Sequence, residues 1–559
     1  MFSLPLSLSL VVLLALDTAQ FGLALPRKWE QRQLATETEA QQKRWGDVPI
    51  MRQRKARRDV EKRSAWGNAV GLGDSEDLFY SVALMLGNTT TAFNLDTGSS
   101  DLWVVSSACQ TGGCEKSTWP QYPLSTFEDT GADVLMQYGD STTGTSASGP
   151  VGRDTVTLAG LSIQSQPFAA VNKTDSSVVV DNDAAGIFGL GFPSESQVQA
   201  AVVNQQFNTP KTTDEFVSTT SQNGPLLSRL AMTGQLAQPM FTITLQRDTI
   251  DVGGNPGVLT IGKLPDGVDN SSLTWVPVKL YSPADGGLNP PTFAPNEIYP
   301  LRWEVELDAV YLDGQKLADS AIKPSGVQST TVSALIDTGN SILRGPEDVV
   351  NTIFSTVSPT YNPASANSVP AFPCGTPHTL AFQIGGKMFP VDPRDFVVQQ
   401  KAGDASNCYA GNLVSTDPPS VGGLFSWSLG DPFFKSNLIA FYYGNLTHPS
   451  QDPPRIGFMS TVPSDASTQL QQVVSSAQNN GGKFASTSDN ALAATANVAS
   501  TTYSMSASAT PASTTGGAQA SQTESSKKKS AAKANFGCAD SVGVAVTALA
   551  SISLLLQLI

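Results

Sequence analysis

The hydrophobic residues in the middle of the chain come in short runs that turn residues interrupt. Between about residues 64 and 460 these runs include FYSVALML, DVLMQY, TVTLAG, MFTITL and GVLTIG. Runs of this length, rich in Val, Ile, Thr and aromatic residues and bounded by Gly, Asn or Asp, are typical of β-strands. The pattern therefore predicts a mostly β protein over this part of the chain.

The composition agrees with this pattern. The chain has 559 residues, of which 47 are Gly, 36 are Pro and 15% are charged. Helical proteins usually carry more Lys, Glu and Leu and fewer turn residues, so this composition favours strands joined by turns. The length is enough for two or more domains with a large buried core.

The first 24 residues have the character of a secretory signal peptide. The segment MFSLPLSLSLVVLLAL is apolar and uncharged, and the small residues that follow offer a cleavage position after Ala24. A membrane anchor is the alternative, but the apolar run is short, contains Pro5 and ends at Asp17. We assign residues 1–24 to a signal peptide and expect the chain to enter the secretory pathway.

Residues 25–63 form a basic segment ahead of an acidic body. Residues 26–63 contain 12 Lys or Arg and 6 Asp or Glu, whereas the chain after residue 63 contains 22 basic and 41 acidic residues. The segment ends in EKR, and secretory processing proteases cut at dibasic pairs. We predict a propeptide that docks on the acidic body and is removed by a dibasic-specific protease after Arg63; a solvated basic tail is the alternative. Nucleic-acid binding does not fit a secreted acidic body.

Two further segments follow the strand-rich region. Residues 462–533 are rich in Ser, Thr, Ala, Gln and Asn, which predicts a disordered, O-glycosylated stalk because little apolar surface can be buried. Residues 534–559 end in the uncharged apolar run VGVAVTALASISLLLQLI, and a lysine cluster lies upstream. This order resembles a GPI-attachment signal, which predicts a lipid anchor on the extracellular face of the plasma membrane or transfer to the cell wall. A C-terminal transmembrane helix is the alternative. The candidate attachment residues are Ser530, Asn535 and Gly537.

The chain has five cysteines, an odd count for a secreted protein. Cys538 would be lost with the C-terminal signal if lipid attachment precedes it. The other four predict two disulfides, a small loop between Cys109 and Cys114 and a larger one between Cys374 and Cys408. Sequons for N-glycosylation also fit the secretory route, at Asn88, Asn172, Asn270 and Asn445.

One tripeptide occurs twice in matched surroundings. Asp96 begins Asp-Thr-Gly in FNLDTGSSDLWV, and Asp337 begins it in ALIDTGNSILRGP. In each case a glycine in an apolar setting follows 93 residues later, Gly189 in AAGIFGLGF and Gly430 in FSWSLGDPFF. We interpret this as a duplicated lobe whose two aspartates meet on a pseudo-two-fold axis.

Two carboxyl groups brought together in this way can catalyse peptide hydrolysis. Ionising both groups costs free energy because their negative charges repel each other. One group therefore keeps a proton while the other is charged, and the two titrate as a unit. The carboxylate can accept a proton from water and the carboxylic acid can donate one to a carbonyl oxygen, without a metal, a cofactor or a covalent intermediate. The pattern therefore predicts a hydrolase with Asp96 and Asp337 as its catalytic residues.

These motifs, with VLMQYGDSTTGTSASG and SLGDPFF, resemble those of the pepsin-like aspartic endopeptidases over roughly residues 75–460. Together with the dibasic segment, the Ser/Thr-rich tail and the GPI-like terminus, they resemble most the fungal yapsin and candidapepsin group. The resemblance implies a mostly β, bilobal fold with pseudo-two-fold related lobes and a central cleft for protein or peptide substrates. We place the N-terminal lobe at residues 64–238 and the C-terminal lobe at residues 239–461, and we expect a monomer.

The resemblance also implies roles for residues around the dyad. Tyr138 and Gly139 would belong to a flap that closes over the substrate, with Trp103 as the hydrogen-bonding partner of Tyr138. The two predicted disulfides fall where disulfides of this family fall. The residues implied to surround the catalytic pair are Thr97, Gly98, Ser99, Thr338, Gly339 and Asn340.

Three further features bear on activity, specificity and access. Asn340 stands where Thr or Ser is usual, so we expect activity with altered pKa values of the dyad. Asp140 follows the flap Tyr-Gly, where an acidic residue in related fungal enzymes accepts Lys or Arg beside the scissile bond; a turn aspartate facing water is the alternative. The segment near residues 195–224 looks longer than the family minimum, which predicts a surface loop that modifies access.

Other functions fit the sequence less well. A serine hydrolase needs a His base, and the chain has only His378 and His448, both in turn-rich stretches. Two isolated histidines and four disulfide-bonded cysteines do not favour a zinc site. The alternative function is a catalytically inactive pepsin-like protein or an adhesin-type cell-wall glycoprotein, and the presence of both aspartates favours the enzyme.

Overall fold

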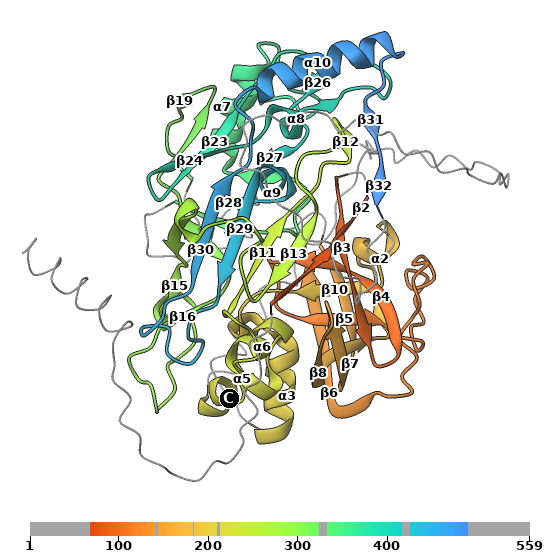
Figure 1. Ribbon diagram of the computed structural model, residues 1–559, viewed down its shortest axis with the longest axis vertical. Helices are drawn as coiled ribbons and strands as arrows, with labels where there is room; N and C mark the ends of the chain where they lie inside the picture. The colour runs from red at the N-terminus through yellow and green to blue at the C-terminus, as the bar shows by residue number, and fades with distance from the viewer. Residues whose placement is uncertain are drawn as a thin grey trace, which may run out of the picture. The chain divides into compact units, whose positions relative to one another are not determined.

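The computed structural model describes residues 67–75, 77–139, 144–182, 184–208, 213–322, 332–415 and 425–489. The predicted signal peptide, the propeptide with Arg63, the flap residue Asp140 and the GPI signal with Ser530, Asn535 and Gly537 lie outside these residues. Strands dominate the described chain, as predicted (Figure 1). Within these ranges, no helix has both the length and the apolar character needed to cross a bilayer.

The N-terminal half of the described chain forms a ten-stranded sheet (Figure 1). Its order is β32-β2-β3-β4-β10-β5-β8-β7-β6, and β9 pairs with β7. Strands β3 and β4 are buried at almost every position, and β3 reads in the sequence as a nearly continuous apolar run rather than as an alternation. The bounds are β2 Gly73–Ser75, β3 Tyr80–Leu86, β4 Thr89–Asp96, β5 Leu102–Val105, β6 Glu128–Tyr138, β7 Thr145–Leu158, β8 Leu161–Val171, β9 Lys173–Thr174, β10 Gly186–Gly189 and β32 Ser488–Asp489.

The second half is built from smaller sheets. A five-stranded sheet has the order β17-β20-β28-β21-β27, a four-stranded sheet β19-β18-β23-β24 and a three-stranded sheet β22-β26-β25, while β15 pairs with β16 and β12 with β31. The bounds are β12 Thr249–Ile250, β15 Leu280–Tyr281, β16 Tyr299–Pro300, β17 Glu304–Glu306, β18 Ala309–Leu312, β19 Gln315–Lys316, β20 Ser333–Ile336, β21 Leu343–Gly345, β22 Ala371–Pro373, β23 Leu380–Ile384, β24 Lys387–Pro390, β25 Val398–Gln399, β26 Asn407–Tyr409, β27 Leu413–Ser415, β28 Trp427–Leu429 and β31 Ala485–Ser486.

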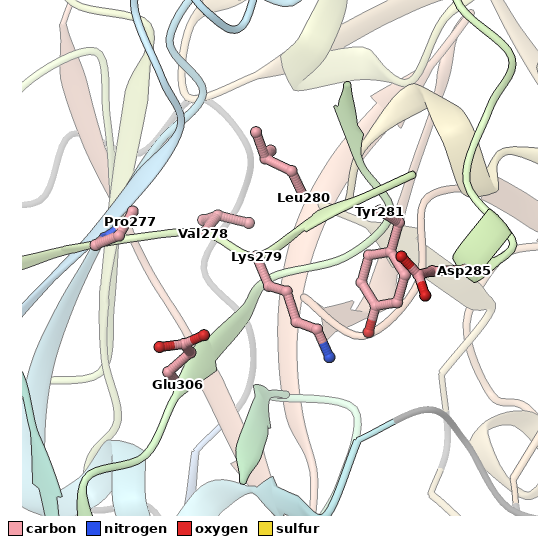
Figure 2. Close-up of a pocket in the computed structure, with 7 residues that line it drawn as sticks. All are labelled: Pro277, Val278, Lys279, Leu280, Tyr281, Asp285 and Glu306. Atoms are coloured by element: carbon pink, nitrogen blue, oxygen red, sulfur yellow. The ribbon is translucent and has the colours of Figure 1, made fainter. Parts of the chain in front are cut away.

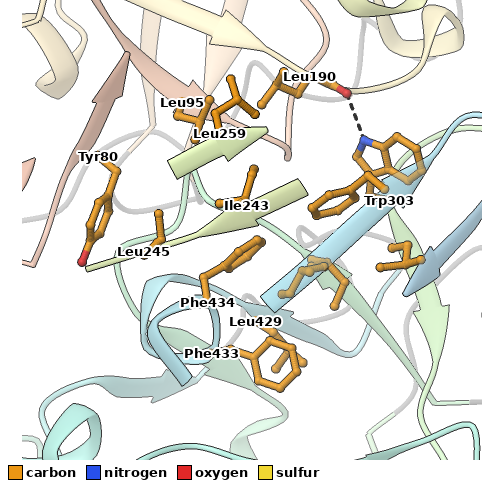
Figure 3. Packing of buried hydrophobic residues seen from close by; sticks show 14 of the residues in the cluster. Tyr80, Leu95, Leu190, Ile243, Leu245, Leu259, Trp303, Leu429, Phe433 and Phe434 are labelled. Carbon is orange, nitrogen blue, oxygen red and sulfur yellow. Dashed lines mark hydrogen bonds between the residues drawn. The ribbon is translucent and has the colours of Figure 1, made fainter. Parts of the chain in front are cut away.

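A six-stranded antiparallel sheet, β1-β13-β11-β29-β30-β14, joins the two halves. Its first strand comes from the start of the described chain and its other strands from the second half. Figure 3 shows the packing around it, where Ile243 and Leu259 lie in one hydrophobic cluster with Leu95 and Leu429, which come from the two repeats. The bounds are β1 Asn68–Gly71, β11 Met240–Thr244, β13 Val258–Ile261, β14 Thr274–Pro277, β29 Asn437–Tyr442 and β30 Arg455–Ser460.

Short helices cover the sheets, and three of them, α3, α4 and α5, correct our expectation of a surface loop near residues 195–224. Helix α3 begins at Ser196, whose hydroxyl accepts a hydrogen bond from the N–H of Gln199, and it buries Val198, Val202 and Val203. The segment folds because Val198 and Val202 share a hydrophobic cluster with residues of β6, while Val203 shares another with Phe216 of α4. The helices are α2 Ser177–Val180, α3 Gln197–Phe207, α4 Asp214–Ser218, α5 Thr220–Asn223, α6 Leu226–Met232, α7 Glu347–Val357, α8 Pro393–Phe396, α9 Asp431–Ser436 and α10 Ala466–Asn479, with 3-10 turns at Pro193–Glu195, Asn270–Ser272 and Pro283–Asp285.

The folded part extends beyond residue 461, which corrects the start of the stalk that we predicted to be disordered. Helix α10 buries Leu470 and Val474 in the main hydrophobic cluster. After it, β31 pairs with β12, and β32 adds an edge strand next to β2 (Figure 1). The average composition of this segment is polar. It folds nevertheless, because a few apolar residues at helical spacing pack on an apolar surface that the rest of the chain forms. The stalk from residue 490 onward lies outside the described residues.

Candidate active site

The two Asp-Thr-Gly loops occupy equivalent places in the topology. Asp96 is the last residue of β4, and Asp337 directly follows β20. In the first repeat β10 pairs parallel to β4 and antiparallel to β5. In the second repeat β28 pairs parallel to β20 and antiparallel to β21. In each repeat, the strand before the loop and the strand after it therefore lie on either side of a third strand, which comes from later in the same repeat.

The glycines found 93 residues after each aspartate lie where these elements cross. A Cβ atom on Gly189 would lie 2.4 Å from the backbone nitrogen of Asp101, and one on Gly430 would lie 1.9 Å from the backbone oxygen of Asn340. Any side chain at either position would collide with the backbone that leaves the Asp-Thr-Gly loop. The repeated spacing seen in the sequence thus marks a required close approach of two chain segments.

The threonines of the two loops are joined by reciprocal hydrogen bonds. The N–H of Thr97 donates to the hydroxyl of Thr338 at 3.1 Å, and the N–H of Thr338 donates to the hydroxyl of Thr97 at 3.0 Å. Each hydroxyl also donates to a carbonyl of the opposite strand at 2.7 Å, Thr97 to Ile336 and Thr338 to Leu95. These four buried hydrogen bonds fix the position of one aspartate relative to the other.

The glycines that follow these threonines let the two carboxyl groups approach. A Cβ atom on Gly98 would lie 2.3 Å from Oδ1 of Asp337, and one on Gly339 would lie 2.4 Å from Oδ1 of Asp96. Each glycine also donates its N–H to the carboxyl of its own loop, at 2.8 Å in both cases. The side chains of Asp96 and Asp337 therefore face each other across the pseudo-two-fold axis.

The two carboxyl groups have different pKa values. Burial and the negative charge of Asp96 raise the pKa of Asp337 to about 8. Burial also raises the pKa of Asp96, but hydrogen bonds from Ser99, Gly98 and Asp337 oppose the rise. Hydrogen bonds therefore favour the charged form of Asp96, whereas the charge of Asp96 opposes ionisation of Asp337, and the two carboxyl groups titrate as a unit.

The expected partners Ser99 and Asn340 behave differently. The hydroxyl of Ser99 donates to Oδ2 of Asp96 at 2.5 Å, and its N–H donates to Oδ1 at 3.2 Å. Asn340 turns away from Asp337 and donates its amide N–H to the hydroxyl of Ser428 at 2.9 Å. We expected Asn340 to surround the dyad as Ser99 does; its side chain instead contacts Ser428 of strand β28 and the N–H of Ile342 in its own loop.

The flap candidate Tyr138 ends strand β6 at the tip of the β6–β7 hairpin, and Gly139 follows with a φ of 84°. Burial and the carboxylates of Asp101 and Asp96 raise the pKa of Tyr138 well above its usual value. The ring lies 6.2 Å from that of Trp103, tilted by 43°. Among the described residues, the buried indole N–H has no hydrogen-bond partner within 3.5 Å. The two side chains that we expected to pair are therefore neighbours, and Trp103 opposes the rise in the pKa of Tyr138 as a hydrogen-bond donor to its hydroxyl would.

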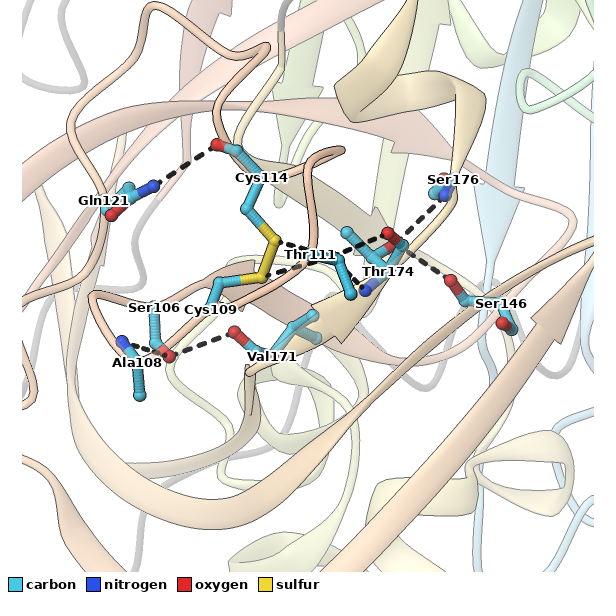
Figure 4. Close-up of a disulfide and its surroundings, with 10 residues drawn as sticks. All are labelled: Ser106, Ala108, Cys109, Thr111, Cys114, Gln121, Ser146, Val171, Thr174 and Ser176. Atoms are coloured by element: carbon cyan, nitrogen blue, oxygen red, sulfur yellow. Dashed lines mark hydrogen bonds between the residues drawn. A yellow bond between two sulfur atoms is a disulfide. The ribbon is translucent and has the colours of Figure 1, made fainter.

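Both predicted disulfides are present. The Cys109–Cys114 bridge closes a loop that Thr111 ties to the carbonyl of Thr174 (Figure 4). Cys374, directly after strand β22, and Cys408 on strand β26 are joined in the buried core.

Three of the four sequon asparagines are exposed, whereas Asn445 is half-buried and accepts hydrogen bonds from the N–H groups of Thr447 and His448. The exposed ones are Asn88, Asn172 and Asn270.

A hollow of about 340 Å³ is found in the second half of the described chain (Figure 2). Lys279, Tyr281 and Asp285 line it, and the ammonium of Lys279 pairs with buried Glu304 at 3.0 Å. Neither aspartate of the Asp-Thr-Gly loops is among its lining residues. It is therefore not the candidate active site.

Sequence reasoning missed a buried network of charged side chains outside the two Asp-Thr-Gly loops. Lys435 pairs with Asp77 at 3.1 Å and with Asp395 at 3.4 Å, and Arg247 binds both oxygens of Asp395 at 2.7 Å. Asp74 lies beside Asp77 and has its pKa raised to about 9 by burial and by the charges of neighbouring aspartates. These residues are scattered along the sequence, and no local motif marks them as neighbours.

Comparison with known proteins agrees with this geometry. A family model described as eukaryotic aspartyl protease matches residues 79–448. An aspartic protease of Phaffia rhodozyma is 27% identical over 416 residues, covering 72% of this chain and 81% of that protein. Cathepsin E-A of Xenopus laevis is 27% identical over 380 residues, covering 67% and 77%, and pepsin A of Sus scrofa is 28% identical over 356 residues, covering 63% and 74%. The chain therefore belongs to the eukaryotic aspartyl protease family, with its pepsin-like fold, and is an aspartic-type endopeptidase.

Proposed function

We propose that Asp96 and Asp337 are the catalytic residues of this endopeptidase. The observation that carries the proposal is the pair of facing carboxyl groups, held by the Thr97–Thr338 hydrogen bonds and different in pKa. The Asp96 carboxylate would take a proton from a water molecule as its oxygen attacks the scissile carbonyl, while protonated Asp337 gives its proton to the carbonyl oxygen. The proton held by Asp96 then passes to the leaving nitrogen, the C–N bond breaks, and the gem-diol returns one proton to Asp337.

The test uses the full-length chain after removal of its basic segment. A diverse peptide library is incubated with it from pH 3 to 7, with and without a statine-type transition-state analogue. Cleavage that is lost with the analogue and in Asp96→Asn supports the mechanism. A folded, processed protein that cleaves nothing would instead favour the inactive pepsin-like protein or the adhesin-type glycoprotein.

We further propose a preference for Lys or Arg beside the scissile bond, with Asp140 as the residue that pairs with it. The support is the position of Asp140 directly after the flap residues Tyr138 and Gly139. In the library assay, Asp140→Asn should lose the basic preference. Asp133→Asn is the matched control, because Asp133 is an exposed carboxylate on strand β6 of the same hairpin. An unchanged preference in Asp140→Asn would assign this specificity to other residues.

The sequence supports a secreted, cell-surface form of the enzyme, as in the yapsin and candidapepsin group. We propose that residues 25–63 keep the zymogen latent until cleavage after Arg63, and that the processed chain is held at the surface by a GPI lipid. Release from intact cells by a phosphatidylinositol-specific phospholipase C would support the lipid anchor. Retention after phospholipase treatment, with release by detergent, would support a transmembrane helix.

A further inference from the structure

The two halves of the catalytic site differ in the residue three positions after the aspartate. In the first repeat this residue is Ser99, whose hydroxyl donates to Oδ2 of Asp96. In the second repeat it is Asn340, whose side chain makes no hydrogen bond to Asp337 within the described residues. Asp96 therefore receives a side-chain hydroxyl donor that Asp337 lacks.

Asn340 is held in this orientation at both ends of its amide. Its Nδ2 donates to the hydroxyl of Ser428 at 2.9 Å, and its Oδ1 accepts from the N–H of Ile342 at 3.3 Å. Ser428 is buried in the middle of β28 and faces Leu335 and Arg344 on the neighbouring strands. Because its partners belong to the sheet and its own loop, turning Asn340 towards Asp337 would break both contacts.

We infer that Asn340 is a positioning residue which, by binding Ser428 instead of Asp337, extends peptide hydrolysis towards neutral pH. The inference rests on the proposed catalytic role of the two aspartates. A donor to the charged form of a carboxyl group favours ionisation, so the absence of one lets Asp337 keep its proton to higher pH. Hydrolysis needs the proton on Asp337, so the pH above which activity is lost follows the pKa of Asp337.

The charged groups around Asp337 come from three elements. Asp96 at the end of β4 opposes its ionisation, Arg344 on β21 favours it, and Asp431 on α9 adds a further carboxyl group nearby. The N–H of Gly339 also stabilises the charged form. None of these groups is changed by substituting Asn340, so the effect of the side chain at this position can be isolated.

The test is the pH profile of kcat/KM for matched variants of the full-length, processed enzyme. Asn340→Ser places at Asp337 the hydroxyl that Ser99 provides at Asp96, and should move the alkaline limb to lower pH by about one unit. Ser99→Ala is the mirror variant and should move the acid limb to higher pH. Asn340→Ala removes the contact with Ser428 without adding a donor and should leave the alkaline limb in place. The melting temperature of each variant at one pH checks that it is folded, and Asn340→Thr carries the same test if Asn340→Ser does not fold.

The outcomes distinguish failure of the inference about Asn340 from failure of the proposed catalytic role of the two aspartates. Superimposable profiles for the wild-type enzyme and Asn340→Ser would overturn the inference. Equal shifts in Asn340→Ser and Asn340→Ala would also overturn it, because the effect would then come from losing the Ser428 contact. A folded wild-type enzyme with no activity at any pH would instead contradict the proposed function.

Discussion

Thr97 and Thr338 each donate a backbone N–H to the other's side-chain hydroxyl, at 3.1 and 3.0 Å, although they are 241 residues apart in the sequence. Both are buried, and each hydroxyl donates a hydrogen bond to a carbonyl in the opposite repeat. The relative position of the two aspartates therefore depends on hydrogen bonds that join the repeats directly below the carboxyl groups.

Replacing Thr97 by Val keeps the shape of the side chain and removes its hydroxyl. We expect a loss of about 1–3 kcal/mol in the free energy of unfolding, because the N–H of Thr338 and the carbonyl of Ile336 each lose a buried partner. The value of kcat should fall further than stability alone explains, since the aspartates are no longer held in register. Thr97→Ser, which retains the hydroxyl, should keep most of both. Equal kcat for the Val and Ser variants would show that these hydrogen bonds do not set the geometry of the dyad.

Gly98→Ala should abolish hydrolysis without unfolding the protein. The added Cβ would lie 2.3 Å from Oδ1 of Asp337, so the carboxyl groups must separate. We expect kcat/KM to fall by at least about 100-fold, as small displacements of catalytic groups commonly cost this much. Gly112→Ala is the matched control, because no atom lies within 4 Å of a Cβ added there. Wild-type kinetics in Gly98→Ala would contradict the close approach of the two loops.

We expect Asp74 to make the folded enzyme less stable as pH rises. Its pKa is raised from 3.8 to about 9 by burial and by the charges of Asp77 and Asp248, so the folded state holds a proton that the unfolded chain releases. Its contribution is fully present below about pH 4 and is lost progressively between pH 4 and 9, at up to about 1.4 kcal/mol per pH unit.

Asp74→Asn should flatten this dependence, because the amide can donate a hydrogen bond as the protonated acid does. Denaturant unfolding at pH 4, 6 and 8 measures the slope. Asp133→Asn, an exposed carboxylate, should leave the slope unchanged. Parallel slopes for the wild-type protein and Asp74→Asn would remove Asp74 as a cause of alkaline destabilisation.

The segment after residue 461 should contribute to the stability of the catalytic unit. Leu470 on α10 is fully buried in the main cluster, and Leu470→Ala should lower the free energy of unfolding by about 2–5 kcal/mol. Gln472→Ala, on the exposed side of the same helix, should have little effect. A chain that ends at residue 461 should also lose the strand pairs β31–β12 and β32–β2 and melt at a lower temperature than one that ends at residue 489. Identical melting temperatures would make this extension a passive tail.

Local chemistry explains why much of the active site was predictable. The Asp-Thr-Gly tripeptides and the glycines at matched spacing each report a constraint that any side chain would violate. The disulfide between Cys109 and Cys114 followed from their closeness in the sequence, and that between Cys374 and Cys408 followed from the cysteine count. Short apolar runs predicted strands because a strand needs few residues to show its pattern.

The sequence of helix α10 contains a helical pattern of apolar residues, but the pattern is too weak to predict a helix. Its buried residues Ala466, Leu470, Val474 and Ala477 recur at helical spacing. The polar residues between them dominate the average composition, which predicts disorder. Whether such a helix forms depends on the apolar surface that receives it, and that surface is made by residues elsewhere in the chain.

The sequence by itself determined that the chain is mostly β and built on a repeat, with two Asp-Thr-Gly loops and two disulfides, because these features are set by residue type at fixed spacing. The tertiary structure alone decided that Asn340 binds Ser428 rather than Asp337, and that Asp74 and Asp77 share one buried network with Lys435. These outcomes depend on which partners the fold brings within about 3–4 Å of a side chain, and residues far apart in the sequence supply those partners.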